Sequence, residues 1–553
     1  MFGLRADILC YASAMMLRIG ADGMVIEHFW TIEPVEYTME GLFTRTAIGI
    51  NGQWPIPGIE ATIGDTLVIH ATNKLNEPTS LHSHGLFQNG TVFYDGAYMV
   101  SECGIAPNSS FTYRIPLQQA GTYWIHSHSK QQSTDGLRTS LVIRDPREQY
   151  EFDEEIILTL QDWFRQPAHE MLKQFRSPDP RVRFTPAVPY GIIGGECANR
   201  KRILFKPNRT YRLRLINIGS SFDFHFSIAS HVLRLIEVDG VLVCERLTHG
   251  VTVGVGQRAS VLVTALNSTD HNYEFRADMY TDLLQMPRYN PLNYTGVVQY
   301  SEEASLKSDT CERWLCINDL DLEPLDGELA LEPTTFISLD AYSGVFSDQT
   351  FRHSFNNHSY APPKIPTALT ALSMATQERA YDPAVYGPQT NAYVLRHMDV
   401  VQITLTNHDY YSHPFHLHGH TFQIIEVGSL RSRQSKLSMN SPVRRDTFVL
   451  KGGHYAILRF RADNPGVWLF HCHINWHIDL GLAMTFVEAP ELIPKVPEML
   501  RENCIAQGIP TGGSNEQDNE PTPYTDQFES YDPPSGWKLV SYFLNGNYDT
   551  IEE

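Results

Sequence analysis

Short segments in which apolar and polar residues alternate recur along the chain. Successive side chains of a β-strand point to opposite faces, so this alternation predicts strands with one buried face. The segments are rich in Val, Ile, Thr and aromatic residues, and Gly, Asn, Asp and Pro bound them. Many short strands joined by polar turns predict an all-β protein built of sandwiches or barrels. Clear examples are Thr66–Thr72, Tyr211–Ile216, Ala259–Thr264 and Val400–Thr406.

Two stretches of the chain look like copies of one domain. Asp65–Asn73 (DTLVIHATN) resembles Asp399–Asn407 (DVVQITLTN), and in both copies an H-x-H-G motif begins seventeen residues after the Asp. A second match relates Gly121–His128 (GTYWIHSH) to Gly466–His473 (GVWLFHCH). Self-similarity of this kind indicates a duplicated structural unit.

A fainter third copy lies between these two. Thr210–Asn217 (TYRLRLIN) spaces its Thr and Asn as the first copy does, but Phe224-His225-Phe226 follows in place of an H-x-H motif. The middle copy therefore predicts the same fold without a metal site. We divide the chain into a signal peptide (1–25), three domains (26–148, 149–305 and 306–500) and a polar C-terminal tail (501–553).

The overall charge is strongly acidic. The 553 residues carry a formal net charge of −20. Binding of nucleic acid relies on Lys and Arg to neutralise phosphates, so this composition argues against a nucleic-acid partner and could instead gather cationic substrates. After the leader no apolar run approaches the roughly 20 residues of a membrane span, so we expect none.

Several features favour the secretory pathway. Ile8–Leu17 supplies the apolar stretch of a signal peptide. Of the eight cysteines, Cys10 lies in the leader and Cys472 lies between two histidines, which leaves six, enough for three disulfides of unspecified pairing. We expect a secreted or cell-wall glycoprotein, because six N-glycosylation sequons occur, at Asn89, Asn108, Asn208, Asn267, Asn293 and Asn357.

The most informative motif is a pair of histidines separated by one residue. On a strand such residues point to the same side, so each pair can direct two imidazoles at one region. Eight imidazoles from two similar domains could converge on one site between them. Imidazole suits copper, zinc, iron and nickel, so histidine alone does not select the metal. The four pairs are His82/His84, His126/His128, His416/His418 and His471/His473.

Cys472 selects copper. It lies between His471 and His473, whose side chains must point away from it. One cysteine and two histidines with a weak axial position define a blue-copper electron-transfer site, and His413 and His477 complete that set. The backbone around Cys472 then links two metal centres. The axial residue should follow His477, and Met484 fits by spacing; a thioether there would lower the potential.

At these motifs the sequence resembles the multicopper oxidases, a family that includes laccases, ascorbate oxidases and fungal iron-oxidising ferroxidases. The resemblance spans roughly residues 30–500 and implies three cupredoxin-like β-sandwich domains of Greek-key type and four coppers per chain. It implies Leu482 at the axial position and a Cys103–Cys504 disulfide. It assigns type 2 copper to His82 and His416; the type 3 pair to His84, His126, His128, His418, His471 and His473; and type 1 copper to His413, Cys472 and His477.

Within the family the chain is most similar to the fungal iron-uptake ferroxidases. Leu86–Thr91 (LFQNGT), Arg444–Thr447 (RRDT) and Ala462–Trp468 (ADNPGVW) carry this likeness. Ferroxidases of this type bind Fe(II) with carboxylates near the type 1 copper. Asp409, four residues before His413, matches one of these carboxylates.

The chain also departs from the family pattern. Phe184–Pro189 offers no carboxylate where the ferroxidases have a glutamate, and Asp278 and Asp282 do not align cleanly with the remaining acid. Asp95 matches the family carboxylate near the copper cluster. Asn475 stands where the family has a second acid, and an amide cannot relay a proton as a carboxylate does.

We therefore expect an oxidase that couples four one-electron oxidations to the reduction of dioxygen to water. A phenolic substrate ranks first, because Asp409 is the only carboxylate clearly placed to bind iron. The Asp409 carboxylate could instead accept the proton of a phenol, and the adjacent Tyr410 and Tyr411 could contact the phenol ring. Fe(II) is the alternative substrate, and a non-catalytic copper-binding protein is a third possibility. We expect a monomer whose catalytic residues are Cys472, His471, His473, Asp95 and Asp409.

Overall fold

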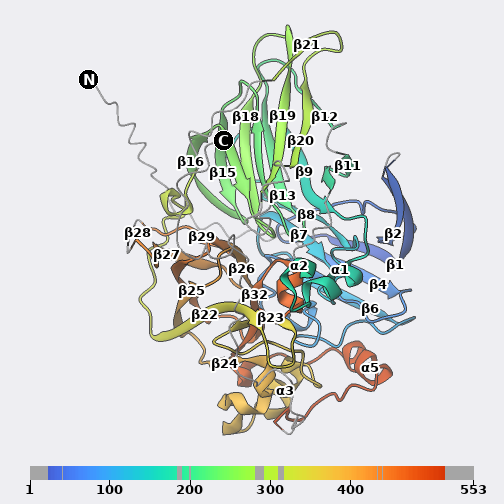
Figure 1. The fold of residues 1–553 in the computed structure, drawn as a ribbon, viewed down its shortest axis with the longest axis vertical. Coiled ribbons are helices and arrows are strands. Elements are labelled where there is room, and N and C mark those ends of the chain that lie inside the picture. Colours follow the sequence, from blue (N-terminus) through green and yellow to red (C-terminus); the bar gives the residue numbers. More distant parts are fainter. Residues whose placement is uncertain are drawn as a thin grey trace.

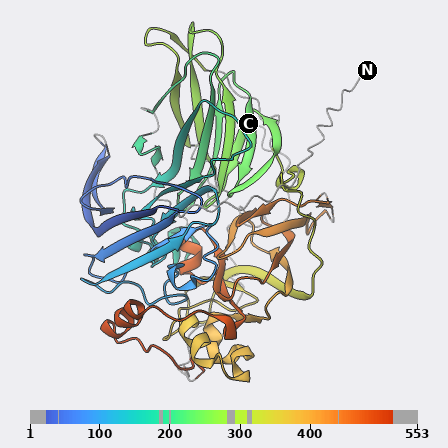
Figure 2. The ribbon, with the colours of Figure 1, turned by 180° about the vertical axis from the view of Figure 1, so that it is seen from behind.

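The computed structural model describes residues 23–39, 42–183, 190–197, 201–280, 292–308, 317–432, 434–438 and 440–516. The predicted all-β class is confirmed: strands dominate and form three units, each built from two sheets. Figure 1 shows these units in chain order, with the first in blue, the second in green at the top, and the third in yellow to orange. Figure 2 shows the same arrangement from behind, so the three units meet near the centre of the molecule.

The first unit contains two four-stranded sheets. One has the order β2 (Phe43–Ile50), β1 (Val25–Met39), β4 (Thr66–Asn73), β6 (Ser110–Pro116). The other has the order β3 (Ile59–Thr62), β8 (Arg138–Arg144), β7 (Gly121–His126), β5 (His82–His84).

The second unit has a seven-stranded and a six-stranded sheet. The first runs β11 (Glu196–Cys197), β10 (Tyr190–Ile193), β9 (Glu154–Trp163), β13 (Thr210–Asn217), β18 (Arg258–Thr264), β15 (Leu233–Val238), β16 (Val241–Thr248). The other runs β12 (Arg202–Leu204), β20 (Leu292–Gln299), β19 (His271–Tyr280), β14 (Asp223–Ile228), β17 (Gly250–Val253), with β21 (Ser305–Lys307) beside β19.

The third unit repeats the plan of the first. One sheet runs β23 (Phe351–Phe355), β22 (Thr335–Val345), β25 (Val400–Asn407), β31 (His454–Arg461), β27 (Phe422–Ser429), β28 (Ser435–Leu437), with β29 (Arg444–Arg445) beside β27. The other runs β24 (Ala392–Leu395), β33 (Ala483–Glu488), β32 (Gly466–Cys472), β26 (His413–Leu417), β30 (Thr447–Leu450).

Helices are short and lie at the ends of the sheets. The α-helices are α1 (Ala168–Phe175), α2 (Pro180–Arg183), α3 (Thr367–Met374), α4 (Asn475–Asp479) and α5 (Glu498–Ala506). Single 3₁₀ turns are η1 (Val92–Tyr94), η3 (Asp319–Asp321), η4 (Glu378–Tyr381), η5 (Pro383–Tyr386), η6 (Pro388–Thr390) and η7 (Pro490–Leu492). No helix among the described residues is long and apolar enough to cross a membrane.

The three repeated sequence segments form the same strand in each unit. β4, β13 and β25 each pair in parallel with the first strand of their unit (β1, β9 or β22) and antiparallel with a later one (β6, β18 or β31). Their inward residues, such as Leu67, Leu213 and Leu405, are fully buried between the two sheets. The internal repeat read from the sequence is therefore a repeat of topology.

An asparagine ends each of these three strands and fixes the loop that follows. Asn73, Asn217 and Asn407 are fully buried. Each side-chain carbonyl accepts from the backbone N–H two residues later, and each amide donates to two backbone carbonyls. In the third unit those carbonyls belong to Tyr411, two residues before His413, and to Leu450, which pairs with His413 between β26 and β30.

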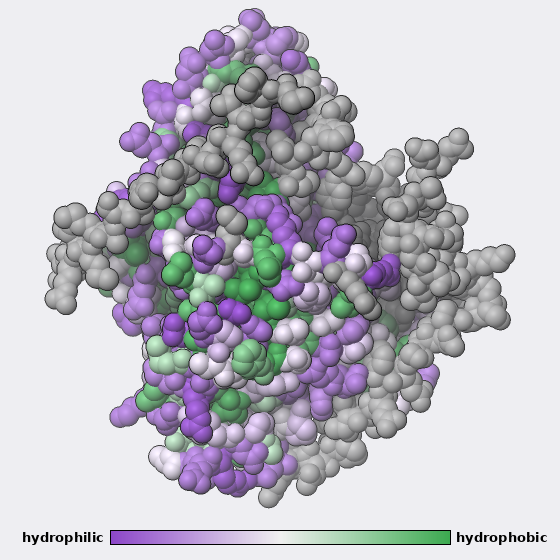
Figure 3. Space-filling view, turned by 90° about the vertical axis from the view of Figure 1, so that its left-hand side faces the viewer, coloured by the Kyte–Doolittle hydropathy of each residue, from purple (hydrophilic) through white to green (hydrophobic). Residues whose placement is uncertain are grey.

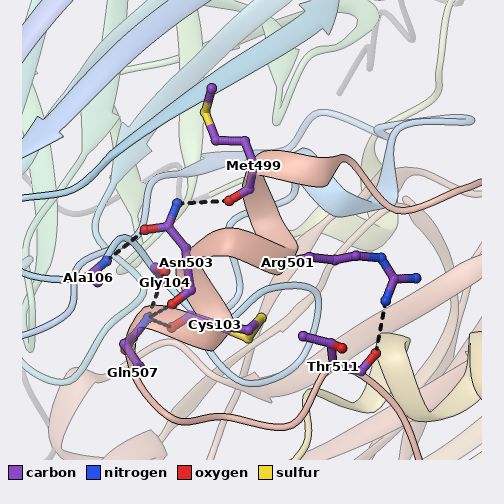
Figure 4. Close-up of a disulfide and its surroundings, with 9 residues drawn as sticks. Cys103, Gly104, Ala106, Met499, Arg501, Asn503, Gln507 and Thr511 are labelled. Carbon is purple, nitrogen blue, oxygen red and sulfur yellow. Dashed lines mark hydrogen bonds between the residues drawn. A yellow bond between two sulfur atoms is a disulfide. The ribbon is translucent and has the colours of Figure 1, made fainter.

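The predicted disulfide ties the end of the described chain to the first unit. Cys103 and Cys504 are bonded, with Cα atoms 5.3 Å apart and a sequence separation of 401. Figure 4 shows the bond beside α5, where Asn503 accepts the Ala106 N–H at 3.0 Å and Gln507 donates to the carbonyl of Cys103 at 3.1 Å. Cys10, Cys311 and Cys316 lie outside the described residues, so the other disulfides stay predictions.

Candidate metal centre

The histidine pairs lie on equivalent strands of the first and third units. β5 pairs with β7 so that His82 faces His126, and β26 pairs with β32 so that His416 faces His471. The expectation that each pair lies on a strand is correct only for His82/His84. In the other three pairs the first histidine is on the strand and the second lies just beyond its end.

All eight paired imidazoles gather between the two units. Three of them bring their Nε2 atoms together: His471 Nε2 is 3.4 Å from that of His128 and 3.2 Å from that of His418. His84 Nδ1 lies 3.1 Å from His473 Nε2. Donor atoms within 4.8 Å of one another define the sets His82/His84/His126, His128/His418/His471 and His82/His416/His418.

Hydrogen-bond acceptors at the periphery of the histidine cluster fix the orientation of these rings. The carbonyl of Asp95 accepts from His82 Nδ1 at 2.7 Å, and its carboxylate accepts from His418 Nδ1 at 2.8 Å. The carbonyl of Asp446 accepts from His416 Nδ1 at 2.8 Å. Partners of this kind set the imidazole tautomer and leave the opposite nitrogen for a metal. Asp95 is therefore beside the cluster, where the sequence placed it.

Asp446 is a residue that sequence reasoning missed. Its Oδ1 accepts from His84 Nε2 at 3.0 Å, and Arg258 of the middle unit binds both carboxylate oxygens at 2.7 and 2.6 Å. Burial alone would raise the pKa of Asp446, but Arg258 and His84 hold it well below its usual range. The middle unit thus supports the cluster without giving it a histidine.

The donor set fits copper. Among the described residues, the buried Nε2 atoms of His82, His126 and His416 have no hydrogen-bond partner. A buried nitrogen without a partner is costly unless a ligand satisfies it. Burial lowers the pKa of six of the paired histidines well below 6.5, which keeps the rings neutral as metal ligands require; these are His84, His126, His128, His418, His471 and His473.

A second site lies around Cys472. The sulfur is 3.3 Å from His413 Nδ1 and 3.4 Å from His477 Nδ1, and these two nitrogens are 3.1 Å apart. All three residues are buried. Burial raises the pKa of the Cys472 thiol well above its ordinary value, so a metal is needed to hold the thiolate. The structure therefore brings together the three residues predicted for a blue copper.

The backbone of Leu482, rather than that of Met484, lies directly beside Cys472. The backbone carbonyl of Leu482 accepts from the N–H of Cys472 at 3.0 Å, and its own N–H donates to His477 at 2.9 Å. Met484 is two residues further along β33 and lies opposite Phe470. Both side chains are fully buried.

Asp409 lies at the outer edge of this second site. Its Oδ2 accepts from His413 Nε2 at 2.8 Å, and its Oδ1 accepts from the N–H and hydroxyl of Ser343 at 2.9 and 2.5 Å. Burial would raise the pKa of Asp409, but the contacts with His413, His353 and Ser343 lower it below its ordinary value. The carboxylate is therefore an anionic oxygen group joined to a copper-site histidine.

His353 also lies at this site, although no sequence motif includes it. Its ring centroid lies 4.3 Å from that of His477 and 5.8 Å from that of His413, and its Nδ1 is 3.9 Å from Asp409 Oδ2. The residue lies on β23, far from every motif, so only the fold places it at the site.

Other predicted residues lie less favourably. Tyr411 is buried and its hydroxyl donates to Ser343 at 2.9 Å, so it cannot stack on a phenol as expected, whereas Tyr410 is partly exposed. Asp278 forms an ion pair with Arg276 at 3.3 Å. Asn475 donates to Thr134 at 2.7 Å. Asp282 and residues 184–189 lie outside the described residues.

Tryptophans pack around the metal-site loops. Trp124 stacks on His126 with ring centroids 4.1 Å apart, and the Trp476 indole N–H donates to Ser221 at 2.7 Å.

Figure 3 shows a face of the molecule on which hydrophobic residues gather among hydrophilic ones. A hollow of about 460 Å³ in the third unit is lined by Leu329, Ile425 and Leu437. It shares no residue with the histidine clusters.

A buried cluster of eight histidines between two duplicated β units, beside a site of two histidines and one cysteine, defines a copper oxidase. Comparison with known families agrees: models described as multicopper oxidase match residues 31–148, 154–303 and 360–492. The chain belongs to the multicopper oxidase family. Members carry type 1, type 2 and type 3 copper and use dioxygen as electron acceptor, and the histidine clusters are compatible with these sites.

Relatives at the sequence level carry names that refer to iron. The iron transport multicopper oxidase fetC of Epichloe festucae is 39% identical over 522 residues, which cover 91% of this chain and 82% of that protein. The iron multicopper oxidase fer1 of Mycosarcoma maydis is 36% identical over 558 residues, covering 93% and 88%.

Solved structures confirm the three-domain cupredoxin-like fold. Fet3p, a multicopper oxidase that functions in iron import, superposes with a TM-score of 0.83 at 32% identity, covering 92% of this chain and all of that one. A laccase from Botrytis aclada gives a TM-score of 0.78 at 29% identity, covering 93% and 95%. The likeness thus includes both an iron-import protein and a laccase.

Proposed function

We propose that this chain is an Fe(II) oxidase that uses dioxygen as its electron acceptor. His413, Cys472 and His477 would hold type 1 copper, with Leu482 in the axial position. His82 and His416 would hold type 2 copper, and the other six paired histidines the type 3 pair. Bound copper supplies one-electron redox chemistry and the place where dioxygen is reduced.

The residues of the chain connect the two sites. Cys472 is bonded through its backbone to His471 and His473, so a short covalent path joins the outer site to the cluster. The Cys472 carbonyl accepts from His471 Nδ1 at 2.9 Å, which holds that ring in place. Asp95 would orient His82 and His418 and keep an anionic group beside the cluster.

The hydrogen bond between Asp409 and His413 is the main structural support for iron as the substrate. Fe(III) is a hard cation that prefers anionic oxygen ligands, so a carboxylate at the outer edge favours oxidation of bound Fe(II). The same carboxylate is joined by a hydrogen bond to a residue that would bind type 1 copper. A net charge of −20 would also gather cations at the surface.

The ranking of phenol above iron made from the sequence is reversed in this proposal. The iron-related names of the relatives support Fe(II), and buried Tyr411 removes one of the two aromatic contacts expected for a phenol. Family membership likewise favours an oxidase over a non-catalytic copper-binding protein.

Purified, copper-loaded protein should be compared on Fe(II) and on a panel of phenols by oxygen consumption. The proposal expects kcat/KM for Fe(II) about tenfold or more above that for any phenol. Metal analysis of the same sample should give about four coppers per chain with the intense blue colour of a copper thiolate. A phenol that outperforms Fe(II) would restore the laccase-like function.

A further inference from the structure

His353 adds a third imidazole to the pair that flanks Cys472. Its backbone N–H donates to the carbonyl of Leu480 at 2.8 Å, which fixes β23 beside the turn that follows His477. The side chain is buried and lies over the His477 ring. One nitrogen from each of His353, His413 and His477 lies within 4.8 Å of the other two.

The spacing of these three rings matches that of the clusters already described. Ring centroids are 4.3, 4.9 and 5.8 Å apart among His353, His413 and His477. They are 4.9, 5.1 and 5.3 Å apart in the set formed by His128, His418 and His471. The distances of His353 from His413 and His477 are therefore similar to those among histidines of the copper cluster, as expected for a metal ligand.

We propose that His353, His413 and His477 form a three-imidazole metal site that overlaps the type 1 site and binds a divalent first-row cation without the Cys472 thiolate. Three neutral imidazoles and an open position are a common ligand set for Cu(II) and Zn(II). Because His413 and His477 belong to both sets, one cation occupies the region at a time. The chain can therefore retain a non-blue copper when the thiolate is lost.

This inference is independent of the substrate, and it is tested with Cu(II) alone. Cys472→Ala removes the thiolate and introduces no new ligand. The double variant Cys472→Ala/His353→Ala also removes the third imidazole. The matched control is Cys472→Ala/His358→Ala, because His358 is an exposed histidine just beyond β23. Each full-length variant is loaded with Cu(II), dialysed, and examined by metal analysis and electron paramagnetic resonance.

We expect Cys472→Ala and the His358 control to keep a fourth copper per chain, with a second non-blue Cu(II) signal beside that of the type 2 copper. The double variant with His353→Ala should lose one copper and that signal. The proposal is overturned if Cys472→Ala already lacks the fourth copper, or if the double variant keeps it.

A second pair of variants covers the case in which Cys472→Ala does not fold. Cys472→Ser keeps nearly the volume of the thiol while removing the thiolate, so it should retain the fourth, non-blue copper that Cys472→Ser/His353→Ala loses. Equal copper content in these two variants would overturn the proposal.

Discussion

The carboxylate of Asp409 accepts a hydrogen bond from Nε2 of His413 at 2.8 Å, while Nδ1 of the same ring faces the Cys472 sulfur at 3.3 Å. One imidazole therefore connects an anionic oxygen at the outer edge with the thiolate inside. A cation held by Asp409 is one hydrogen bond away from a residue that would bind type 1 copper.

Asp409→Ala should lower kcat/KM for Fe(II) by about 10- to 100-fold, the effect of losing one charged hydrogen-bonding partner. Steady-state oxygen consumption measures this. Asp409→Asn, which keeps the shape but removes the charge, should lie between the alanine variant and the wild type. If turnover of a phenol falls as much as that of Fe(II), Asp409 acts on the copper site itself and not on iron.

Leu482→Met should lower the potential of the blue copper, because a thioether in the axial position is a better donor than an aliphatic side chain. Redox titration of the blue band measures the change. The matched control is Met484→Leu, two residues further along the chain in β33 and opposite Phe470. A potential that responds to Met484→Leu and not to Leu482→Met would assign the axial position to Met484.

Asp446→Asn should weaken copper binding at the cluster by about 10- to 100-fold, because the carboxylate orients His84 and is itself held by Arg258. Chelator titration followed by metal analysis tests this. Asp326→Asn is a suitable control, since Asp326 is an exposed acid that pairs with Arg444. Equal copper loss in both variants would show that Asp446 has no special role.

Secreted protein from the native host should lose mass on glycosidase treatment. The six sequon asparagines are all exposed, so none needs unfolding to be modified. Mass spectrometry before and after treatment identifies the occupied sites. An unglycosylated cytosolic protein would contradict the expected secretion and the expected additional disulfides.

The sequence predicted the parts of this molecule that repeat. The alternating segments became β4, β13 and β25, and the H-x-H pairs identified the cluster, because periodicity and duplication are visible in one dimension. Asp446 and His353 were not predicted as site residues, because neither periodicity nor duplication marks them in the sequence. Asp446 was read only as part of a family motif, and His353 is brought to the copper site by strand packing alone.

Glu102 links stability to pH, although no motif includes it. It is buried, accepts a hydrogen bond from the Tyr113 hydroxyl at 2.9 Å, and burial raises its pKa to about 8. In the unfolded chain a glutamate titrates near 4.3, at about its ordinary value. Between these pH values the folded protein holds a proton that the unfolded chain has lost, so the free energy of unfolding falls as pH rises.

Glu102→Gln removes this dependence, because glutamine does not titrate and still offers an oxygen to Tyr113. The variant should therefore gain stability over the wild type as pH rises from about 5 to 8, by up to about 1.4 kcal/mol per pH unit. Thermal unfolding of equally copper-loaded samples at several pH values measures the difference. Glu302→Gln, at an exposed position, should show no such trend. If the difference in Tm between Glu102→Gln and wild type stays constant across this range, Glu102 is already ionised in the folded protein.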